Sequence, residues 1–362
     1  MGIALRLRPA AVMLLAIAAA LLATAVLAFG GASGTIGATG TAGTTGTAGT
    51  TGATGTAGAL APAGQGGTGG TGGTGGTSGT GATVTGGPVI QAVGAENQYA
   101  NVIAQVGGGY VHTTALLSNP NTDPHTFEAS AAVARQVGQA RIVVQNGLGY
   151  DSFMNSIEAA SPSASRMVID VQQLLKLPDT TANPHLWYAP GTMPKVADAI
   201  ARDLSTIEPQ HSAYFMKNAE EFTSSLGAWN AALTAFANTY KHAKVASTEP
   251  VADYLLQAAG ADNMTPWSFQ AAIMNGTDPS PQDVATEKAL LADREVSVLV
   301  YNEQVTDPLT DSLIALADDE NIPVVGVYET MPEPGYDYQS WMLAETSALQ
   351  RAVADHISAE RL

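Results

Sequence analysis

The 362-residue sequence contains no cysteine. Disulfide bridges, thiolate metal ligands, cysteine nucleophiles and a lipid anchor on an N-terminal cysteine are therefore excluded. Basic residues are also scarce, with 15 Lys and Arg against 32 Asp and Glu and a net charge of −17. This balance argues against nucleic acid as a partner and suits a soluble protein that binds cations, although acidity for solubility alone explains it equally well.

Charge is nearly absent from the first 83 residues, which carry only Arg6 and Arg8. In residues 1–29 these arginines precede a long apolar run, a pattern typical of an export signal. The run is also long enough to span a bilayer, so an uncleaved signal-anchor that tethers the chain to the membrane is the alternative. Either interpretation places the rest of the chain in the periplasm or on the outer face of the cytoplasmic membrane.

Residues 30–87 are a Gly, Thr and Ala repeat without charged or aromatic side chains. Because this segment has almost nothing to bury, it is predicted to be a disordered linker. As a flexible coil it would span on the order of 40 Å. It is either a spacer that holds a domain away from a membrane or a leader that is lost on maturation.

From residue 88 onward, short apolar segments alternate with segments of helical periodicity. This alternation predicts βαβ units and parallel sheets, in an N-terminal α/β lobe over residues 88–208 and a C-terminal α/β lobe over 241–362. A closing helix is predicted over 338–362. The predicted strands are 89–93, 110–117, 141–146, 167–170, 244–247, 296–301 and 323–328.

Between the lobes, apolar residues recur at alternating spacings of four and three from Phe215 to Tyr240. This is the stripe of a single helix over residues 209–240, about 45 Å long. The stripe itself indicates core packing. The fold class predicted is therefore α/β, with two lobes joined by a long rigid helix.

Two of the six histidines occupy matching contexts. His125 lies in Asp-Pro-His-Thr-Phe after a predicted strand, and His185 lies in Asn-Pro-His-Leu-Trp. In an open α/β sheet the carboxyl ends of strands are where ligands bind, and imidazole is the commonest neutral ligand of transition metals. These two are candidate metal ligands. The remaining histidines are interpreted as ordinary solvated or core residues: His112, His211, His242 and His356.

Two glutamates follow predicted strands of the second lobe, Glu249 after residues 244–247 and Glu329 after 323–328. A carboxylate beside an apolar run is costly to desolvate unless it is paired or coordinates an ion. The alternative for each is a salt bridge or a helix N-cap, and the N-cap is the stronger alternative for Glu249 because Pro250 follows it.

Nine further segments accompany these residues: AENQYANVIAQVGGGYV, LLSNPNTDPHTFEAS, QNGLGYDSFM, ANPHLWY, IEPQHSAYFMKNAEEF, VASTEPVADYLL, DPSPQDVA, VLVYNEQV and VVGVYETMP. Together they resemble the zinc/manganese group of ABC-transporter solute-binding proteins. The resemblance covers residues 88–362 in the family's order. It implies two α/β lobes, a rigid connecting helix, one metal ion in the cleft between the lobes and delivery of that ion to a membrane permease, by a monomer that is not an enzyme.

The ligands that the resemblance implies are His125, His185, Glu249 and Glu329. Glu329 departs from the family pattern, since the fourth ligand is usually Asp, and Asp337 or Glu333 could substitute for it. The histidine-rich loop of some zinc-type members is missing.

Two imidazoles and two carboxylates would neutralise a divalent cation and leave Zn²⁺ and Mn²⁺ as near-equal candidates. Ca²⁺ and Mg²⁺ are disfavoured because imidazole is a poor ligand for hard cations. An exported zinc hydrolase is a competing hypothesis, since two His and a Glu can form a catalytic set. The chain has no His-Glu-x-x-His run, however. A surface adhesin with incidental metal binding is the third reading, which the Gly/Thr linker favours.

Overall fold

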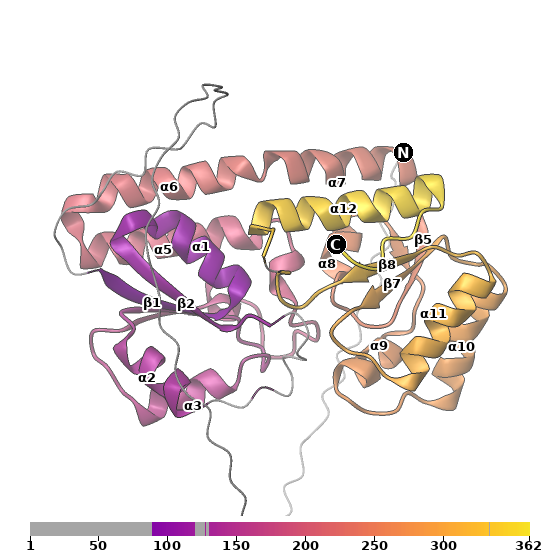
Figure 1. The fold of residues 1–362 in the computed structure, drawn as a ribbon, viewed down its shortest axis with the longest axis horizontal. Helices are drawn as coiled ribbons and strands as arrows, with labels where there is room; N and C mark the ends of the chain where they lie inside the picture. Colours follow the sequence, from indigo (N-terminus) through magenta and orange to yellow (C-terminus); the bar gives the residue numbers. More distant parts are fainter. Residues whose placement is uncertain (1–88, 120–126, 128–129, 333) are drawn as a thin grey trace, which may run out of the picture. The chain divides into compact units, whose positions relative to one another are not determined.

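The structure, a computed structural model, describes residues 89–119, 127, 130–332 and 334–362. The predicted signal segment (1–29), the predicted linker (30–87) and the candidate ligand His125 lie outside the described residues. Two sheets of parallel strands organise the described part of the chain (Figure 1). This confirms the predicted α/β class with two lobes. The strands are β1 (Ile90–Glu96), β2 (Val111–Leu117), β3 (Ile142–Gln145), β4 (Met167–Asp170), β5 (Lys244–Ser247), β6 (Asp262–Asn263), β7 (Val298–Asn302) and β8 (Val324–Val327).

The first sheet has the strand order β2-β1-β3-β4, and each neighbouring pair is parallel. The middle of β3 is fully buried, as expected for a strand covered by helices on both faces. Because β2 lies on one side of β1 and β3 on the other, the chain reverses its direction of winding between β1 and β3. The carboxyl end of this switch point is where an open α/β sheet binds ligands.

The second sheet repeats the first, with the order β6-β5-β7-β8 and parallel pairing throughout. Its switch point therefore lies between β5 and β7. Glu249 comes two residues after the end of β5, and Asn302 is the last residue of β7. The topology alone thus brings polar residues that follow different strands to one edge of this sheet.

The described helices pack on both sheets. Those of the first lobe are α1 (Asn97–Gly107), α2 (Ala131–Gln139), α3 (Phe153–Ala160), α4 (Val171–Leu175) and α5 (Thr192–Ile207). Those that follow the second sheet's first strand are α8 (Asp253–Ala259), α9 (Trp267–Met274), α10 (Pro281–Ala292), α11 (Pro308–Asp319) and α12 (Tyr338–Asp355). Among the described helices, none is both long enough and apolar enough to cross a bilayer.

The predicted single helix over residues 209–240 is interrupted in the structure. A short 3-10 turn, η4 (Pro209–His211), leads into α6 (Ser212–Ser225), and α7 (Gly227–Tyr240) follows after Leu226. The last turn of α6 is tightened into a 3-10 turn. Leu226 N–H donates to Thr223 O at 3.3 Å, and the Ser225 hydroxyl donates to Phe222 O, the carbonyl that Leu226 N–H would otherwise bond. The apolar stripe nevertheless stays buried across the break, Leu226 included. Figure 1 shows α6 and α7 end to end; α6 packs on α1 and α5, and α7 on α8 and α12.

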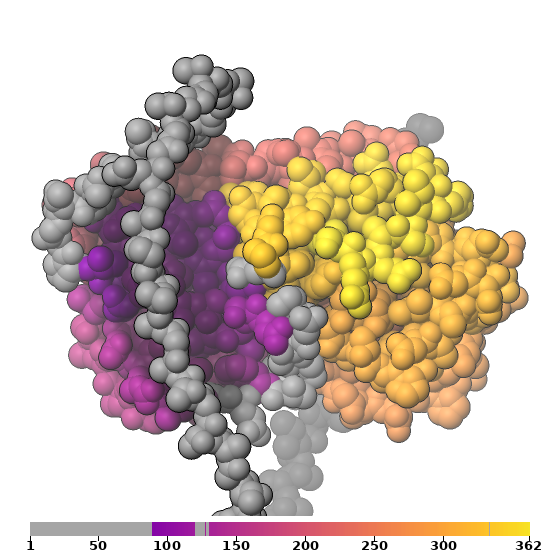
Figure 2. Space-filling view, in the orientation of Figure 1, coloured from indigo at the N-terminus to yellow at the C-terminus, as the bar shows by residue number. Residues whose placement is uncertain are grey.

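The predicted closing helix over 338–362 is too long. α12 ends at Asp355, where His356 adopts a left-handed backbone with φ 55°. The remaining residues run beside β8, with Ala359 N–H donating to Val324 O at 2.8 Å and Gly326 N–H to Ala359 O at 2.9 Å. A Cβ on Gly326 would overlap the Glu360 carbonyl, so this approach requires glycine. Figure 2 shows the chain from α12 to the C-terminus in yellow at the surface of the second lobe.

Three elements were missed by the sequence patterns. β6 has only two residues and α4 only five, too few to show a periodicity. α9 begins at Trp267 with no acidic residue in its first turn and no side-chain cap. The helix that the sequence predicts over residues 250–259 begins only at Asp253, as α8. None of these differences moves a strand end that carries a candidate ligand.

Candidate metal centre

His185 is held rigidly in the interior by the residue two positions before it. The side-chain oxygen of Asn183 accepts the His185 backbone N–H at 3.0 Å and lies 2.7 Å from the ring Nδ1. Since an amide oxygen can only accept, this contact assigns the proton to Nδ1 and leaves a lone pair on Nε2. The side chain is fully buried, and among the described residues Nε2 has no hydrogen-bond partner. Buried polar atoms are normally hydrogen-bonded, so this exception needs an explanation, and a lone pair kept available for a metal ion is one.

Glu329 comes one residue after Tyr328, beyond the end of β8, and its carboxylate faces that lone pair. Its Oε2 lies 3.7 Å from His185 Nε2. For an ion about 2.1 Å from both atoms, the angle between the two bonds would be roughly 120°, which is compatible with normal coordination. The pair therefore has the spacing to share one cation.

Three neighbours fix the Glu329 carboxylate and its backbone. Tyr150 donates its hydroxyl to Oε2 and Asn302 donates its amide to Oε1, each at 2.8 Å. The Glu329 backbone N–H donates to the side chain of Gln304 at 2.7 Å. Such bonds orient a carboxylate without neutralising its charge, which is the usual arrangement around ligands of a metal.

Tyr150 reaches Glu329 from the first lobe by way of a tight turn. Gly147 and Gly149 have φ of 80° and 81°, a conformation that favours glycine. The Asp151 carboxylate accepts the backbone N–H groups of Asn146 and Gly147, at 2.5 and 3.0 Å, and so closes the turn. Burial raises the pKa of Asp151 to about 6, and these two bonds oppose that rise.

Glu249 is buried at the switch point of the second sheet, with 2% of its surface exposed. The N-cap alternative for it is wrong, because Ala252 occupies the N-cap of α8 and no side chain caps that helix. Asn183 donates its amide to Pro250 O at 2.8 Å, and Tyr254 donates to Asn183 O at 3.0 Å. The side chain that orients His185 thus also bonds to the residue directly after Glu249.

Asp337 and Glu333 are the two alternatives to Glu329 as the fourth ligand. Asp337 is exposed and caps α12, where its carboxylate accepts Ser340 N–H at 2.8 Å. It is therefore engaged in starting the helix. Glu333 lies outside the described residues, as does His125. In the ranges that the structure describes, no three His, Cys, Asp or Glu side chains gather closely enough to hold an ion. The described part of the candidate centre is the His185–Glu329 pair, and Asn183 bonds both to His185 and to Pro250, the neighbour of Glu249.

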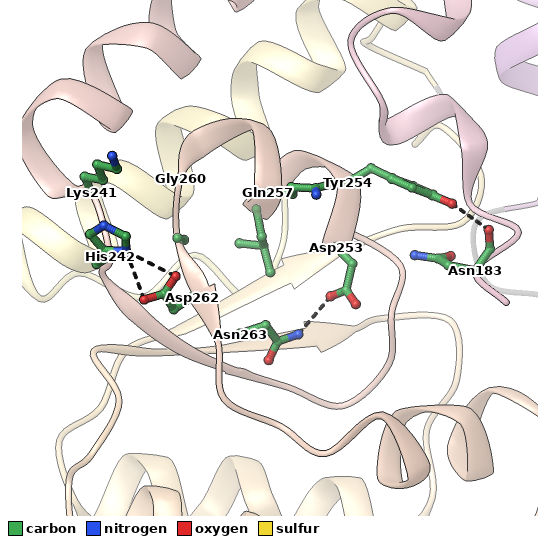
Figure 3. A pocket seen from close by; sticks show the side chains of 11 residues that line it. Asn183, Lys241, His242, Asp253, Tyr254, Gln257, Gly260, Asp262 and Asn263 are labelled. Carbon is green, nitrogen blue, oxygen red and sulfur yellow. Dashed lines mark hydrogen bonds and ion pairs between the residues drawn. The ribbon is translucent and has the colours of Figure 1, made fainter. Parts of the chain in front are cut away.

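A surface pocket of about 450 Å³ reaches this region from solvent. Tyr150 and Pro184 line it from the first lobe, and Trp267 and Met274 line it from α9. A second pocket of about 470 Å³ touches Asn183 on another side (Figure 3). Neither pocket is lined by His185 or Glu329 themselves, but each touches a residue that bonds to one of them.

The sequence patterns missed the residues that orient the ligands: Tyr150, Asn183, Asn302 and Gln304. Asn302 carried a usable signal, since it ends a buried strand in the same way that Glu249 and Glu329 follow theirs. Tyr150 carried none, because its role depends on a left-handed turn that brings it to the other lobe.

Comparison with known proteins gives a consistent picture. A family model described as "Zinc-uptake complex component A periplasmic" (ZnuA) matches residues 93–352. Among curated proteins, the "Manganese-binding lipoprotein MntA" of Bacillus subtilis is 27% identical over 143 residues, which cover 38% of this chain and 46% of that protein. The "Zinc-binding protein TroA" of Treponema pallidum is 25% identical over 133 residues, covering 35% and 42%. The aligned stretches thus span about half the length of these relatives.

Solved structures match over a larger part of the chain. The solute-binding protein FpvC of Pseudomonas aeruginosa, solved in complex with Mn²⁺, has a TM-score of 0.62 at 20% identity. The match covers 74% of this chain and 99% of that one. At this identity the likeness establishes the fold.

Proposed function

The chain belongs to the family of periplasmic zinc-uptake components, and on that premise we propose that it captures a Zn²⁺ or Mn²⁺ ion outside the cytoplasm and delivers it to an ABC-type permease for import. The observation that carries this proposal is the buried His185–Glu329 pair, 3.7 Å apart, with a lone pair on Nε2 that no described residue satisfies. The family places such a site between two lobes, here residues 88–208 and 241–362. The helical segment 209–240 joins them and limits their movement.

We propose His125, His185, Glu249 and Glu329 as the ligands. Two imidazoles and two carboxylates give a neutral site with a divalent ion, and four protein ligands close the coordination shell against water. A closed shell suits capture better than hydrolysis, which needs an open coordination position. The relatives divide by name between manganese and zinc, and the mixed His and Glu donors fit either ion.

Residues 1–29 direct export in this proposal, as a cleaved signal or as a membrane anchor, and residues 30–87 space the monomeric binding domain from the membrane. The acidic surface, with a net charge of −17, favours cations near the protein and disfavours nucleic acid.

The proposal is tested by titrating the metal-stripped full chain with Zn²⁺ and with Mn²⁺ in a calorimeter. We expect saturable binding of one equivalent of each, tighter for Zn²⁺ in vitro because of the Irving–Williams order. Affinity should fall on acidification, since protons compete with the ion for imidazole. Absence of saturable binding, or turnover of ester or peptide substrates by the loaded protein, would contradict the proposal.

Asn183→Ala is expected to weaken Zn²⁺ binding by about tenfold, because the imidazole loses the bond that fixes its tautomer and orientation. The matched control is Asn263→Ala. Asn263 lines the same pocket (Figure 3), but its amide bonds Ser247 and Asp253 instead of the histidine. Calorimetry on both variants separates the two roles. Equal affinities in the two variants would show that Asn183 does not orient His185.

A further inference from the structure

A hydrogen-bonded chain connects α12 to the backbone that carries Glu329, through a residue next to His185. Tyr188 is the last residue of the 3-10 turn η3 (Leu186–Tyr188), which begins directly after His185. Glu345 lies in the middle of α12. We propose that Tyr188 and Glu345 are positioning residues that hold Glu329 in its metal-binding position, with the Glu345 carboxyl in its protonated form. The inference rests on the proposed function and adds a regulator of the same site.

Tyr188 bonds directly to the residue before Glu329. Its hydroxyl donates to Tyr328 O at 2.8 Å, and Tyr328 N–H donates back to the same hydroxyl at 3.2 Å. One phenol thus bonds both backbone polar groups of Tyr328. Because Tyr188 is three residues from His185 and Tyr328 adjoins Glu329, this contact fixes the two ligand-bearing segments relative to each other.

Glu345 holds the Tyr188 hydroxyl from the other side. Its Oε1 lies 2.9 Å from that hydroxyl and accepts Trp341 Nε1–H at 2.6 Å. Its Oε2 has no hydrogen-bond partner among the described residues. The carboxyl is 2% exposed and borders a small apolar cavity. That cavity is lined by Ala252, Leu255, Leu256, Val300, Val325, Val327 and Leu349.

The ionisable groups that face this carboxyl are phenols. Tyr188 approaches from η3, Tyr328 from the end of β8 and Tyr338 from α12 itself. The charge of Glu329 acts on Tyr188 from the opposite side. The surfaces that α8, β7 and β8 present to the cavity are apolar. Nothing in this set supplies a positive charge that would favour an ionised Glu345.

Counting protons leads to the same state. The single Tyr188 hydroxyl proton lies within bonding distance of two acceptors, Tyr328 O and Glu345 Oε1. With Glu345 ionised, its Oε1 keeps the bond from Trp341 but competes with Tyr328 O for the single Tyr188 proton. With Glu345 protonated, its O–H donates to Tyr188 and Tyr188 donates to Tyr328 O, so the competition for the Tyr188 proton is removed. Burial also raises the pKa of Glu345 to about 8, although the hydrogen bonds from Tyr188, Trp341 and the Tyr328 backbone oppose the rise.

The direction of the pH effect follows. Below pH 8 the neutral acid leaves the Tyr188 proton on Tyr328 O. As the pH rises through about 8, Glu345 ionises and draws that proton to itself, which releases the Tyr328 carbonyl and loosens Glu329. Metal affinity should therefore decline on the alkaline side. This is a limb separate from the acidic one, where protons compete for imidazole.

The test compares the full-length wild type with Tyr188→Phe and Glu345→Gln, using Zn²⁺ in competition with a chromophoric chelator from about pH 7 to about pH 9.5. Tyr188→Phe should weaken binding by about tenfold at neutral pH, as loss of an orienting partner does. Glu345→Gln cannot ionise, so its affinity should lack the alkaline decline, whatever its value at neutral pH.

Glu287→Gln is the matched control. Glu287 is equally buried on α10, and burial raises its pKa to about 8 as well. It accepts a hydrogen bond from Thr265 and is not part of the hydrogen-bonded chain that leads to Tyr328. This variant should keep the wild-type alkaline decline. Wild-type affinity and pH profile in both Tyr188→Phe and Glu345→Gln would overturn the inference and leave the proposed function standing. A wild type that binds no Zn²⁺ would overturn both. If Tyr188→Phe fails to fold, the Glu345→Gln profile decides alone.

Discussion

His185→Ala is expected to weaken Zn²⁺ binding by a hundredfold or more. Four-ligand zinc sites have apparent binding free energies of about 10–16 kcal/mol, so one ligand accounts for roughly 3 kcal/mol. By the usual relation of 1.4 kcal/mol per tenfold, that is on the order of a hundredfold. The change also leaves Glu329 without its neighbour at 3.7 Å in a fully buried site. Calorimetry on the metal-stripped variant measures the loss.

The control for this prediction is His242→Ala. His242 is exposed and its ring lies 3.1 Å from Asp262, in a pairing that solvent screens (Figure 3). Its removal should leave the affinity unchanged. The sequence predicts the same large loss for His125→Ala, whose position lies outside the described residues. Near-native affinity in His185→Ala would show that the buried pair is not the metal site.

The fold was largely predictable because its strands are short apolar runs with clear ends. The run from Ile142 to Val144 is fully buried, and its hydrophobicity is continuous instead of alternating, as a parallel sheet covered on both faces requires. The repeated strand order of the two sheets was not predictable from these runs. It follows from which strands pair, and that is decided by packing between segments far apart in the chain.

The apolar stripe from Phe215 to Tyr240 shows that hydrophobic periodicity predicts a buried face but not a break in the helix. Phe222, Leu226 and Trp229 are all buried, so the spacing correctly predicted one continuous face. The break at Leu226 arises from a local competition for carbonyl groups by the Ser225 hydroxyl. A hydrophobic pattern carries no information about such bonds.

Of the candidate site, the sequence singled out the buried imidazole and carboxylates but not the residues that hydrogen-bond to them. Glu329 could be singled out because a charged residue after an apolar strand needs an explanation. Tyr150 and Asn183 reach the ligands through a glycine turn and through an Asn-Pro-His geometry, both of which depend on tertiary structure. Glu345 had no signal at all, since a Glu in a helix is ordinarily solvated.

Glu329→Ala is the second prediction with a large effect, and it decides which carboxylate is the fourth ligand. Removing this side chain should weaken Zn²⁺ binding by on the order of a hundredfold, because it takes away one ligand of four and the negative charge beside His185. It also leaves the donors of Tyr150 and Asn302 without their shared acceptor in a buried site. Competition with a chromophoric chelator measures the change in affinity.

The matched change is Asp337→Asn, eight residues along the chain. Asp337 is exposed and caps α12, and Asn is as good an N-cap as Asp, so the helix should start normally. Metal affinity should then equal that of the wild type. The reverse result, a large loss in Asp337→Asn with little in Glu329→Ala, would place the fourth ligand at the start of α12. Glu329 would then be a buried acid held by Tyr150 and Asn302 for the structure alone, and the 3.7 Å approach to His185 would be a plain ion pair. Since the neutral Asn keeps the cap while removing the charge, the two variants distinguish coordination from helix stability.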